Sequence, residues 1–412
     1  MSSELYDAGP HPSSPRRGLA GRIFEAFGKR MVRHQIHGQI TLTLPDGHEV
    51  VLGGASCDGF VADLKINSYQ VLAKAIRRGS VGFGEAYIAG DIDSSDLVAL
   101  FRFFLDNRKA LQQAGGKLFR ARLGDKLAHW RRRNTLRGSR KNIEAHYDLG
   151  NDFYALWLDP TMTYSSGLFS RPGMTLAEAQ HAKYDRTLEL MQLKPNARIL
   201  EIGCGWGGMA EHAGRAGHLL DGITLSKEQL SYARKRIRRQ GLENRVSLSL
   251  QDYRQTTGQY DAIVSIEMIE AVGEDNWPTY FARISDLLKP GGRAVIQAIT
   301  IAPEYFDRYR SKADFIQRYI FPGGMLLTDQ AIARQAASYG MSVVHTQKFG
   351  ADYARTLNEW RDRFNTSSGQ VSKLGYHQKF KRMWLYYLTY CEAGFADGAI
   401  NVGFYMIEKP SN

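Results

Sequence analysis

Cysteine is scarce in this sequence. Its 412 residues include three cysteines, Cys57, Cys204 and Cys391, which lie far apart and form no Cys-x-x-Cys pair. This spacing excludes a disulfide framework and gives no support to a zinc site, so we expect no bound metal. The three thiols are best interpreted as small buried residues.

Long apolar runs are also absent. No stretch of about 18 apolar residues occurs, and the N-terminal segment has no apolar core of the kind found in secretory signals. We therefore expect neither a membrane-spanning helix nor secretion, and we predict a cytoplasmic protein. With 43% hydrophobic residues, the chain can bury a large core, and its length suggests two to three globular domains.

Positive charge is in excess. The formal net charge is +12 and the pI is about 9.5, which calls for an anionic partner, either nucleic acid or an anionic membrane leaflet. Ten Lys or Arg lie between Lys117 and Lys141 against a single acid, Asp125, with apolar residues such as Trp130 interleaved. We interpret this segment as a basic amphipathic linker that docks on anionic phospholipid; the alternative is a solvated interdomain helix. This segment has no array of aromatic residues on which bases could stack, so we predict no nucleic-acid partner. A nucleic-acid binder is kept as the non-enzyme alternative.

The composition changes along the chain and predicts four segments. Residues 1–18 are rich in Ser, Pro and Gly and are predicted to be a disordered tail. Residues 19–110 are predicted to form a small α+β domain with a hairpin at Asp46-Gly47, residues 111–142 are the basic linker, and residues 143–412 form a larger domain. Strand-like runs alternate with helical segments there, which predicts an α/β fold with a doubly wound parallel sheet. These runs are 197–202, 219–223, 246–250, 262–266 and 294–299.

A glycine-rich turn lies where the first of these strands ends. Residues 201–207 read EIGCGWG, and glycines at such a turn let the backbone approach a ligand closely. Gly203, Gly205 and Gly208 formally fit the dinucleotide pattern G-x-G-x-x-G. The second strand, however, is not closed by an acidic residue at the usual ribose-binding place, although Asp221 is near. The turn alone does not decide between cofactors.

Further motifs give the turn its context. EIGCGWGG is followed by TLSKEQ and by a strand ending in QDY; GEAYIAGDID precedes them, as does AHYDLGNDFYALWLDPTMTYSSGLF, and KFKRMWLYYLTYCEAGF comes near the end. From about residue 60 onward the chain closely resembles the cyclopropane fatty acid synthase family. The resemblance implies a seven-stranded class I methyltransferase sheet, with its last strand near 400–407, and binding of S-adenosylmethionine. The residues implied to contact this cofactor are Tyr164, Ser165, Glu201, Gly203, Gly205, Gly207, Thr224, Ser226, Gln229, Asp252 and Tyr253.

The resemblance also implies the reaction. The methyl group would go to the cis double bond of an unsaturated phospholipid acyl chain, and the resulting cation would lose a proton to give a cyclopropane. Other open products are a methylene or methyl branch, and other open acceptors are a different lipid or a small molecule. Aromatic residues between 305 and 321 and helices between Tyr353 and Phe395 are expected to cover the acyl site. The small domain is expected to serve membrane docking or homodimer formation at the inner face of the membrane.

The base in this family is a bicarbonate ion, and its ligands are carried over one by one. Glu270 and Tyr353 match the family's glutamate and tyrosine, and the backbone near Ile299 matches a further contact. The family's cysteine and histidine are replaced by Ser166 and Gln297. Both can hydrogen-bond bicarbonate, but a neutral amide cannot take up a proton as imidazole can. Whether bicarbonate binds is therefore left open.

A second glutamate competes with the first. Glu267 lies three residues before Glu270, so either carboxylate could face the pocket. The resemblance favours Glu270, and we interpret Glu267 as a polar residue at the start of a helix.

Overall fold

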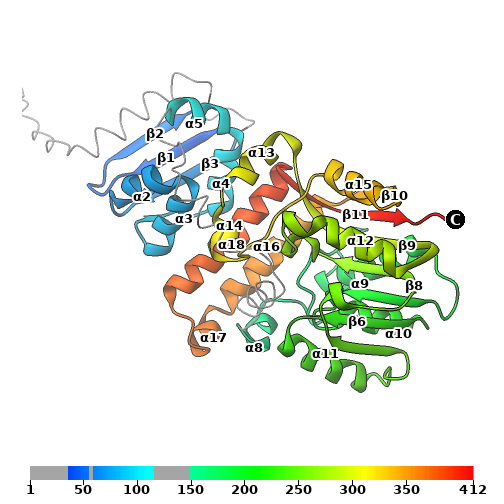
Figure 1. Cartoon of the computed structure of the whole chain (residues 1–412). Coiled ribbons are helices and arrows are strands. Elements are labelled where there is room, and N and C mark those ends of the chain that lie inside the picture. Colours follow the sequence, from blue (N-terminus) through cyan, green and yellow to red (C-terminus); the bar gives the residue numbers. More distant parts are fainter. Residues whose placement is uncertain (1–35, 55–58, 116–148, 412) are drawn as a thin grey trace, which may run out of the picture.

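The computed structural model describes residues 36–54, 59–115 and 149–411. The predicted tail, the basic linker between Lys117 and Lys141, and Cys57 lie outside the described residues. Figure 1 shows a small sheet near one end of the molecule and a large sheet near the other, with helices between them. In the parts of the chain that are described, no helix is long and apolar enough to cross a bilayer.

The small sheet has the strand order β2-β1-β3-β4. Strands β1 and β2 pair in antiparallel register around Gly47, which has φ +82°, and the amide of His48 donates to the Asp46 carboxylate at 3.1 Å. The predicted hairpin is confirmed. The elements of this part are β1 (Gln39–Thr43), β2 (Glu49–Gly53), β3 (Val61–Ile66), α2 (Gln70–Arg78), α3 (Ser80–Ala89), β4 (Ile92–Asp93), α4 (Leu97–Asp106) and α5 (Arg108–Gly115).

The large sheet has seven strands in the order β10-β11-β9-β8-β5-β6-β7. All five predicted strands are present, and the last strand is where the resemblance placed it. The five predicted strands run parallel to one another, as expected, and the sheet as a whole is mixed because β11 runs antiparallel to both β9 and β10. The strands are β5 (Arg198–Ile202), β6 (Leu219–Thr224), β7 (Val246–Leu250), β8 (Tyr260–Ile266), β9 (Leu288–Ile301), β10 (Ser342–Lys348) and β11 (Ile400–Glu408).

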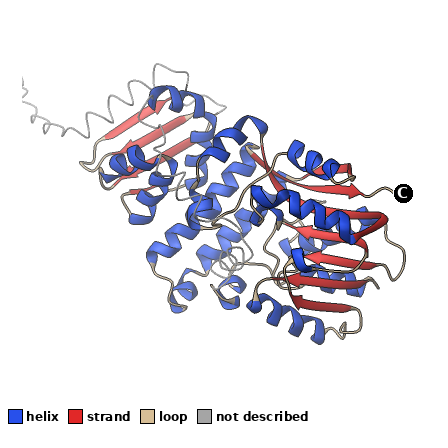
Figure 2. Cartoon of the chain, in the orientation of Figure 1, coloured by secondary structure: helices blue, strands red, loops and turns tan. Residues whose placement is uncertain are grey.

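Helices cover both faces of this sheet (Figure 2). Apolar residues of α9 (Leu176–Met191), α10 (Gly208–Arg215) and α11 (Lys227–Arg239) join one buried cluster with residues of the sheet. Those of α12 (Trp277–Leu287) and α15 (Asp329–Ser338) join a second cluster with the sheet's other inward-facing side chains. The ligand-binding edge, where the parallel strands end, therefore lies between two closed hydrophobic layers.

A further group of helices joins the two sheets. The small domain packs through α3 and α4 against α18, where Arg382 donates to the carbonyls of Tyr87 and Ile92 at 2.6 and 2.8 Å. Gly84 of α3 lies so close to Phe315 that an added Cβ would meet its ring at 2.6 Å. The remaining helices are α8 (Asn151–Ala155), α13 (Pro303–Ser311), α14 (Phe315–Tyr319), α16 (Gly350–Thr366), α17 (Ser368–Lys373), α18 (Gln378–Asp397) and the 3₁₀ turns Tyr253–Gln255, Ile269–Ala271 and Glu274–Asn276.

Candidate active site

The glycine turn after β5 has the backbone that its sequence predicts. Gly203 and Gly205 have φ of +86° and +50°, a region that disfavours residues with a Cβ. The amides of Gly203 and Cys204 both donate to the carbonyl of Ile223 on β6 at 3.0 Å. These bonds fasten the turn to the neighbouring strand and hold it at the edge of the sheet.

This turn forms one side of a cavity. The cavity contains most of the residues that the resemblance assigned to the cofactor, brought together from the segment before α9, from the ends of β5, β6 and β7, and from the first turn of α11. They are Tyr164, Ser165, Glu201, Gly203, Gly205, Thr224, Gln229, Asp252 and Tyr253. Gly207 and Ser226 do not line it: Gly207 is the N-cap of α10, and Ser226 is the N-cap of α11, accepting from the amide of Gln229 at 3.2 Å.

Glu201 is the acidic group best placed for a ligand in this cavity. Its side chain is 3% exposed, and its Oε2 is buried with no hydrogen-bond partner among the described residues. Burial raises the pKa of Glu201 to about 8, although the charges of Lys183 and Arg236 oppose the shift. A buried acceptor without a donor indicates a place for a hydroxyl or ammonium group of a ligand.

Two further acidic or aromatic groups stand at the end of β7. The Asp252 carboxylate caps the following 3₁₀ turn and binds the Arg254 guanidinium at 2.7 and 2.8 Å. Tyr253 packs edge-on against Tyr280 with 5.6 Å between ring centroids, so its ring is held at the wall of the cavity. An aromatic face fixed in this way suits a flat heterocyclic ligand.

The predicted base site is gathered around Glu267. Its Oε1 accepts from the amide of Ser166 at 2.9 Å and from Nε2 of Gln297 at 2.7 Å, and its Oε2 accepts from the hydroxyl of Tyr353 at 2.6 Å. Glu267 also lines the cofactor cavity. The structure thus differs from our interpretation of Glu267 as a polar residue at a helix start: it is a half-buried carboxylate to which three of the predicted site residues donate.

Glu270 lies beside this group but does not share its donors. Its Oε1 accepts from the amide of Ile299 at 2.5 Å, and its Oε2 is buried without a hydrogen-bond partner in the described chain. Burial, followed by the charge of Glu267, raises the pKa of Glu270 to about 8. The amide of Ile299, expected to contact the base, donates to Glu270 instead, and the catalytic role of Glu270 stays a prediction.

Sequence reasoning missed Lys183. This fully buried lysine of α9 donates to the Ser165 hydroxyl at 2.6 Å, and burial lowers its pKa to about 7 against the opposing charges of Glu267, Asp159 and Glu201. A signal was available, since Gln180, Lys183 and Thr187 recur at helical spacing on the buried face of α9. Polar residues on the inward stripe of a helix indicate a buried polar network.

Known proteins resemble this chain over most of its length. Residues 134–404 match the family model described as mycolic acid cyclopropane synthetase. The chain belongs to the mycolic acid cyclopropane synthetase family. It is an S-adenosylmethionine-dependent methyltransferase. The matched region, residues 134–404, includes the glycine turn and the segment with Glu267 and Glu270.

Individual members of this synthetase family are similar in sequence and structure. The chain is 37% identical to a tuberculostearic acid methyltransferase of Mycobacterium tuberculosis, covering 96% of this chain and 94% of the relative. It is 35% identical to the cyclopropane-fatty-acyl-phospholipid synthase of Escherichia coli over 81% and 84% of the two chains. The cyclopropane synthase MmaA2 of Mycobacterium tuberculosis superposes with a TM-score of 0.62 at 32% identity, covering 66% and 98%. A second solved cyclopropane synthase, CmaA1 with SAH and CTAB, has the same TM-score at 31% identity and the same coverage. These similarities support methylation of a lipid with S-adenosylmethionine as the donor.

The cavity residues fit the family's cofactor, and Glu201 predicts how its binding depends on pH. A hydroxyl or ammonium group of the ligand that donates to Glu201 favours the ionised carboxylate. Below pH 8 the Glu201 carboxyl must therefore lose its proton before the ligand binds. We expect the affinity for S-adenosylhomocysteine to rise by up to roughly tenfold per pH unit below pH 8 and to level off above it. Isothermal titration calorimetry between pH 6 and 9 measures this. Glu201→Gln should flatten the curve, and a slope that survives in this variant would contradict the assignment.

Proposed function

We propose that this enzyme transfers the methyl group of S-adenosylmethionine to the cis double bond of an unsaturated phospholipid acyl chain, and that loss of a proton from the resulting cation gives a cyclopropane. When bound, the cofactor supplies an electrophilic methyl group on a sulfonium. One observation carries the proposal: the cofactor cavity and the buried base cluster share Glu267. A methyl donor and a proton acceptor would therefore meet at one wall, as addition to an alkene followed by deprotonation requires.

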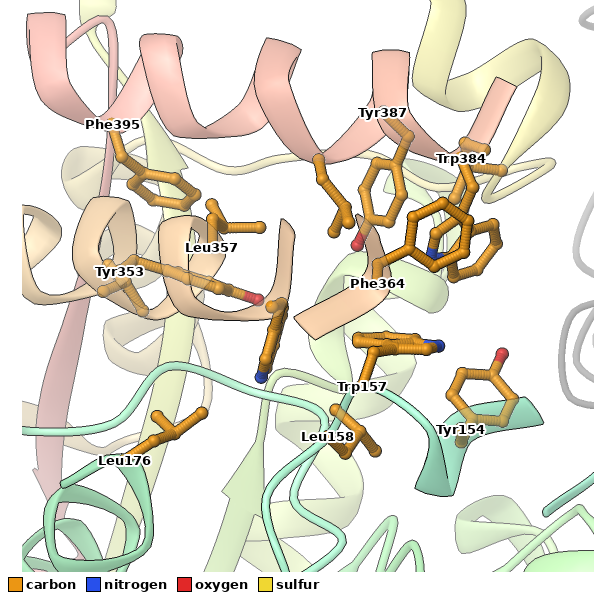
Figure 3. Packing of buried hydrophobic residues seen from close by; sticks show 14 of the residues in the cluster. Tyr154, Trp157, Leu158, Leu176, Tyr353, Leu357, Phe364, Trp384, Tyr387 and Phe395 are labelled. Carbon is orange, nitrogen blue, oxygen red and sulfur yellow. The ribbon is translucent and has the colours of Figure 1, made fainter. Parts of the chain in front are cut away.

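The surroundings of this wall suit an apolar acceptor. Tyr164 lines the cavity, and its ring lies 5.4 Å from those of Trp157 and Trp360, while its hydroxyl bonds to that of Tyr387 at 2.7 Å. Figure 3 shows Trp384 and Tyr387 projecting from α18 toward Trp157. Aromatic faces in a dry site stabilise a developing cation and accept an acyl chain. The predicted cover by helices α16 and α18 agrees with this arrangement.

A branched product is the alternative that specific residues favour. Gln297, with 0% exposure, replaces the family's histidine and cannot take up a proton. A changed path for proton removal would let a hydride shift come first, and the proton would then leave to give a methylene branch. The relative named a tuberculostearic acid methyltransferase supports methylation of a fatty acyl chain in either case.

Membrane association is part of the proposal. An acyl chain in a phospholipid is reached only at a bilayer surface, and the net charge of +12 favours an anionic leaflet on the cytoplasmic face. We propose peripheral binding, with the small domain serving docking or a homodimer. Sedimentation with anionic vesicles, compared with zwitterionic ones and with RNA, separates this interpretation from nucleic-acid binding.

Mass spectrometry of cell lipids tests the function. Cells expressing the enzyme are grown with methyl-labelled methionine, and their phospholipids are compared with those of cells expressing Glu201→Gln. We expect a labelled gain of CH₂ in unsaturated acyl chains. A product that resists mild hydrogenation is a cyclopropane, and a reducible product is a methylene branch. Absence of labelled lipid in the presence of folded enzyme would refute the proposal.

Tyr353 offers a conservative test of the base cluster. Its ring stacks on Phe395 with 4.4 Å between centroids, and phenylalanine keeps this contact while removing the hydroxyl that donates to Glu267. We expect Tyr353→Phe to lower kcat on the order of 10- to 100-fold and to leave S-adenosylhomocysteine binding unchanged. Phe395→Leu, which alters the stack but not the hydroxyl, is the control. An unchanged kcat in Tyr353→Phe would remove this tyrosine from the site.

A further inference from the structure

The donors expected to hold a bicarbonate ion already hold a carboxylate. The amide of Ser166, the side-chain amide of Gln297 and the hydroxyl of Tyr353 lie 2.6 to 2.9 Å from the two oxygens of Glu267. Ser166 and Gln297 are 0% exposed and Tyr353 is 5% exposed, so the three donors are sheltered from water, while Glu267 is half-buried at the wall of the cavity. A carboxylate has the shape and charge of the ion that the sequence resemblance placed here.

Bicarbonate does not fit beside this carboxylate. The hydroxyl of Ser166 donates to the carbonyl of Gly167 at 2.9 Å, and the amide of Ile299 donates to Glu270, so these two groups are engaged as well. The polar atoms left over, Oε1 of Gln297 and Oε2 of Glu270, are acceptors when Glu270 is ionised. The donor left for a second anion among these groups is the Glu270 hydroxyl, present while Glu270 is protonated, and the anion would lie against the charge of Glu267, which is costly.

The backbone of Glu267 has an unusual conformation, which places its carboxylate among these donors. Its φ is +48°, one of four positive values at non-glycine residues in the described ranges. Such a conformation costs on the order of 1–3 kcal/mol and persists where the surroundings impose it, most often at functional sites. The amide of Glu267 is held by the carbonyl of Gln297 at 2.8 Å, so the turn after β8 directs the side chain into the cluster.

We propose that the Glu267 carboxylate takes the place of the bicarbonate ion and is the base of the reaction, an inference that rests on the proposed function. The alkene π pair forms the new bond to the methyl carbon, and the pair of the broken C–S bond stays on sulfur. The adjacent carbon becomes a cation. Glu267 then removes a proton from the added methyl group, either directly, which gives a cyclopropane, or after a hydride shift has moved the cation to the carbon that bears this group, which gives a methylene branch. The C–H pair forms the ring bond or the double bond, and the protonated carboxyl later releases its proton to water.

Exchange of Glu267 for glycine tests the assignment. Glycine adopts φ +48° without strain, and its lack of a side chain frees the donors of Ser166, Gln297 and Tyr353 for an ion. In carbonate-free buffer we expect Glu267→Gly to form product at least about 100-fold more slowly than the wild type. Added bicarbonate should raise the rate of product formation by Glu267→Gly at least tenfold. The wild type should work equally fast with and without bicarbonate. Asn196→Gly, at another positive φ of +58°, is the matched control and should behave like the wild type.

A second variant tests the need for a carboxylate, and a binding measurement tests the anion site without relying on turnover. Glu267→Gln fills the same space without a carboxylate, so we expect a loss of about 100-fold or more that bicarbonate does not restore. NMR with ¹³C-labelled bicarbonate, in the presence of S-adenosylhomocysteine, should detect binding to Glu267→Gly but not to the wild type. Retained S-adenosylhomocysteine binding confirms that each variant is folded.

The outcomes separate the two proposals. Bicarbonate binding by the wild type, or a wild-type rate that falls more than tenfold without bicarbonate, would overturn the role of Glu267 and leave the proposed function standing. Full activity of Glu267→Gln would do the same. If no lipid acceptor is methylated by the wild type, the proposed function fails. The NMR comparison still decides whether Glu267 fills the anion site.

Discussion

Replacing Gly203 with valine is expected to lower the affinity for S-adenosylhomocysteine by at least about 100-fold, which corresponds to ~2.7 kcal/mol. Gly203 has φ +86°, where a β-branched residue is strongly disfavoured, and a Cβ there would lie 2.9 Å from Cγ of Met268. Valine would turn the backbone away, breaking the two amide bonds to Ile223 that hold the turn at the cavity.

Titration calorimetry checks this expectation against a matched exchange. Gly369 of α17 has no atom within 4 Å of an added Cβ and no positive φ, so Gly369→Val should bind S-adenosylhomocysteine like the wild type. Circular dichroism shows whether both variants keep the fold. Binding by Gly203→Val within fivefold of the wild type would mean that the turn does not position the cofactor.

Loss of the buried Lys183 charge is expected to have the largest effect on stability. Lys183 is surrounded by Glu267, Asp159 and Glu201, and it donates to Ser165. Lys183→Met keeps the apolar part of the side chain but leaves the carboxylates of Asp159 and Glu267 without their cation, which typically costs about 3–5 kcal/mol. Glu201, whose pKa is about 8, is protonated at the pH of this measurement. The measurement is urea unfolding followed by tryptophan fluorescence at pH 6.5, below the lowered pKa of Lys183, where the lysine is charged.

The pH dependence and a control complete this prediction. Burial raises the pKa of Glu267, so its protonation at lower pH removes uncompensated charge, and the difference between Lys183→Met and the wild type should shrink as the pH falls toward 5. Lys235→Met, on the exposed face of α11, should change the free energy of unfolding by less than about 0.5 kcal/mol. A loss below 1 kcal/mol in Lys183→Met would show that the lysine does not balance these carboxylates.

Local sequence patterns were sufficient to predict the hairpin at Asp46-Gly47, the five strands and the glycine turn at Gly203. Each depends on local chemistry: alternating or continuous apolar runs fix strands, and positive φ calls for glycine at defined places in a turn. Motif order along the chain added the family and its cofactor. The mixed character of the sheet was not predicted, because the period of a strand does not reveal its direction or its neighbours, and β11 lies between β9 and β10.

The groups that form the base site could be identified only from the folded chain. Glu267 and Glu270 are three residues apart, and a backbone φ of +48° at Glu267 determines which carboxylate receives the donors. Those donors, Ser166, Gln297 and Tyr353, come from segments 30 to 101 residues away in the sequence. Buried polar groups are satisfied by partners that the fold brings together, and sequence spacing carries no record of such pairs. Periodicity identifies the buried face of a helix such as α9, but only packing places Lys183 of that face beside Ser165.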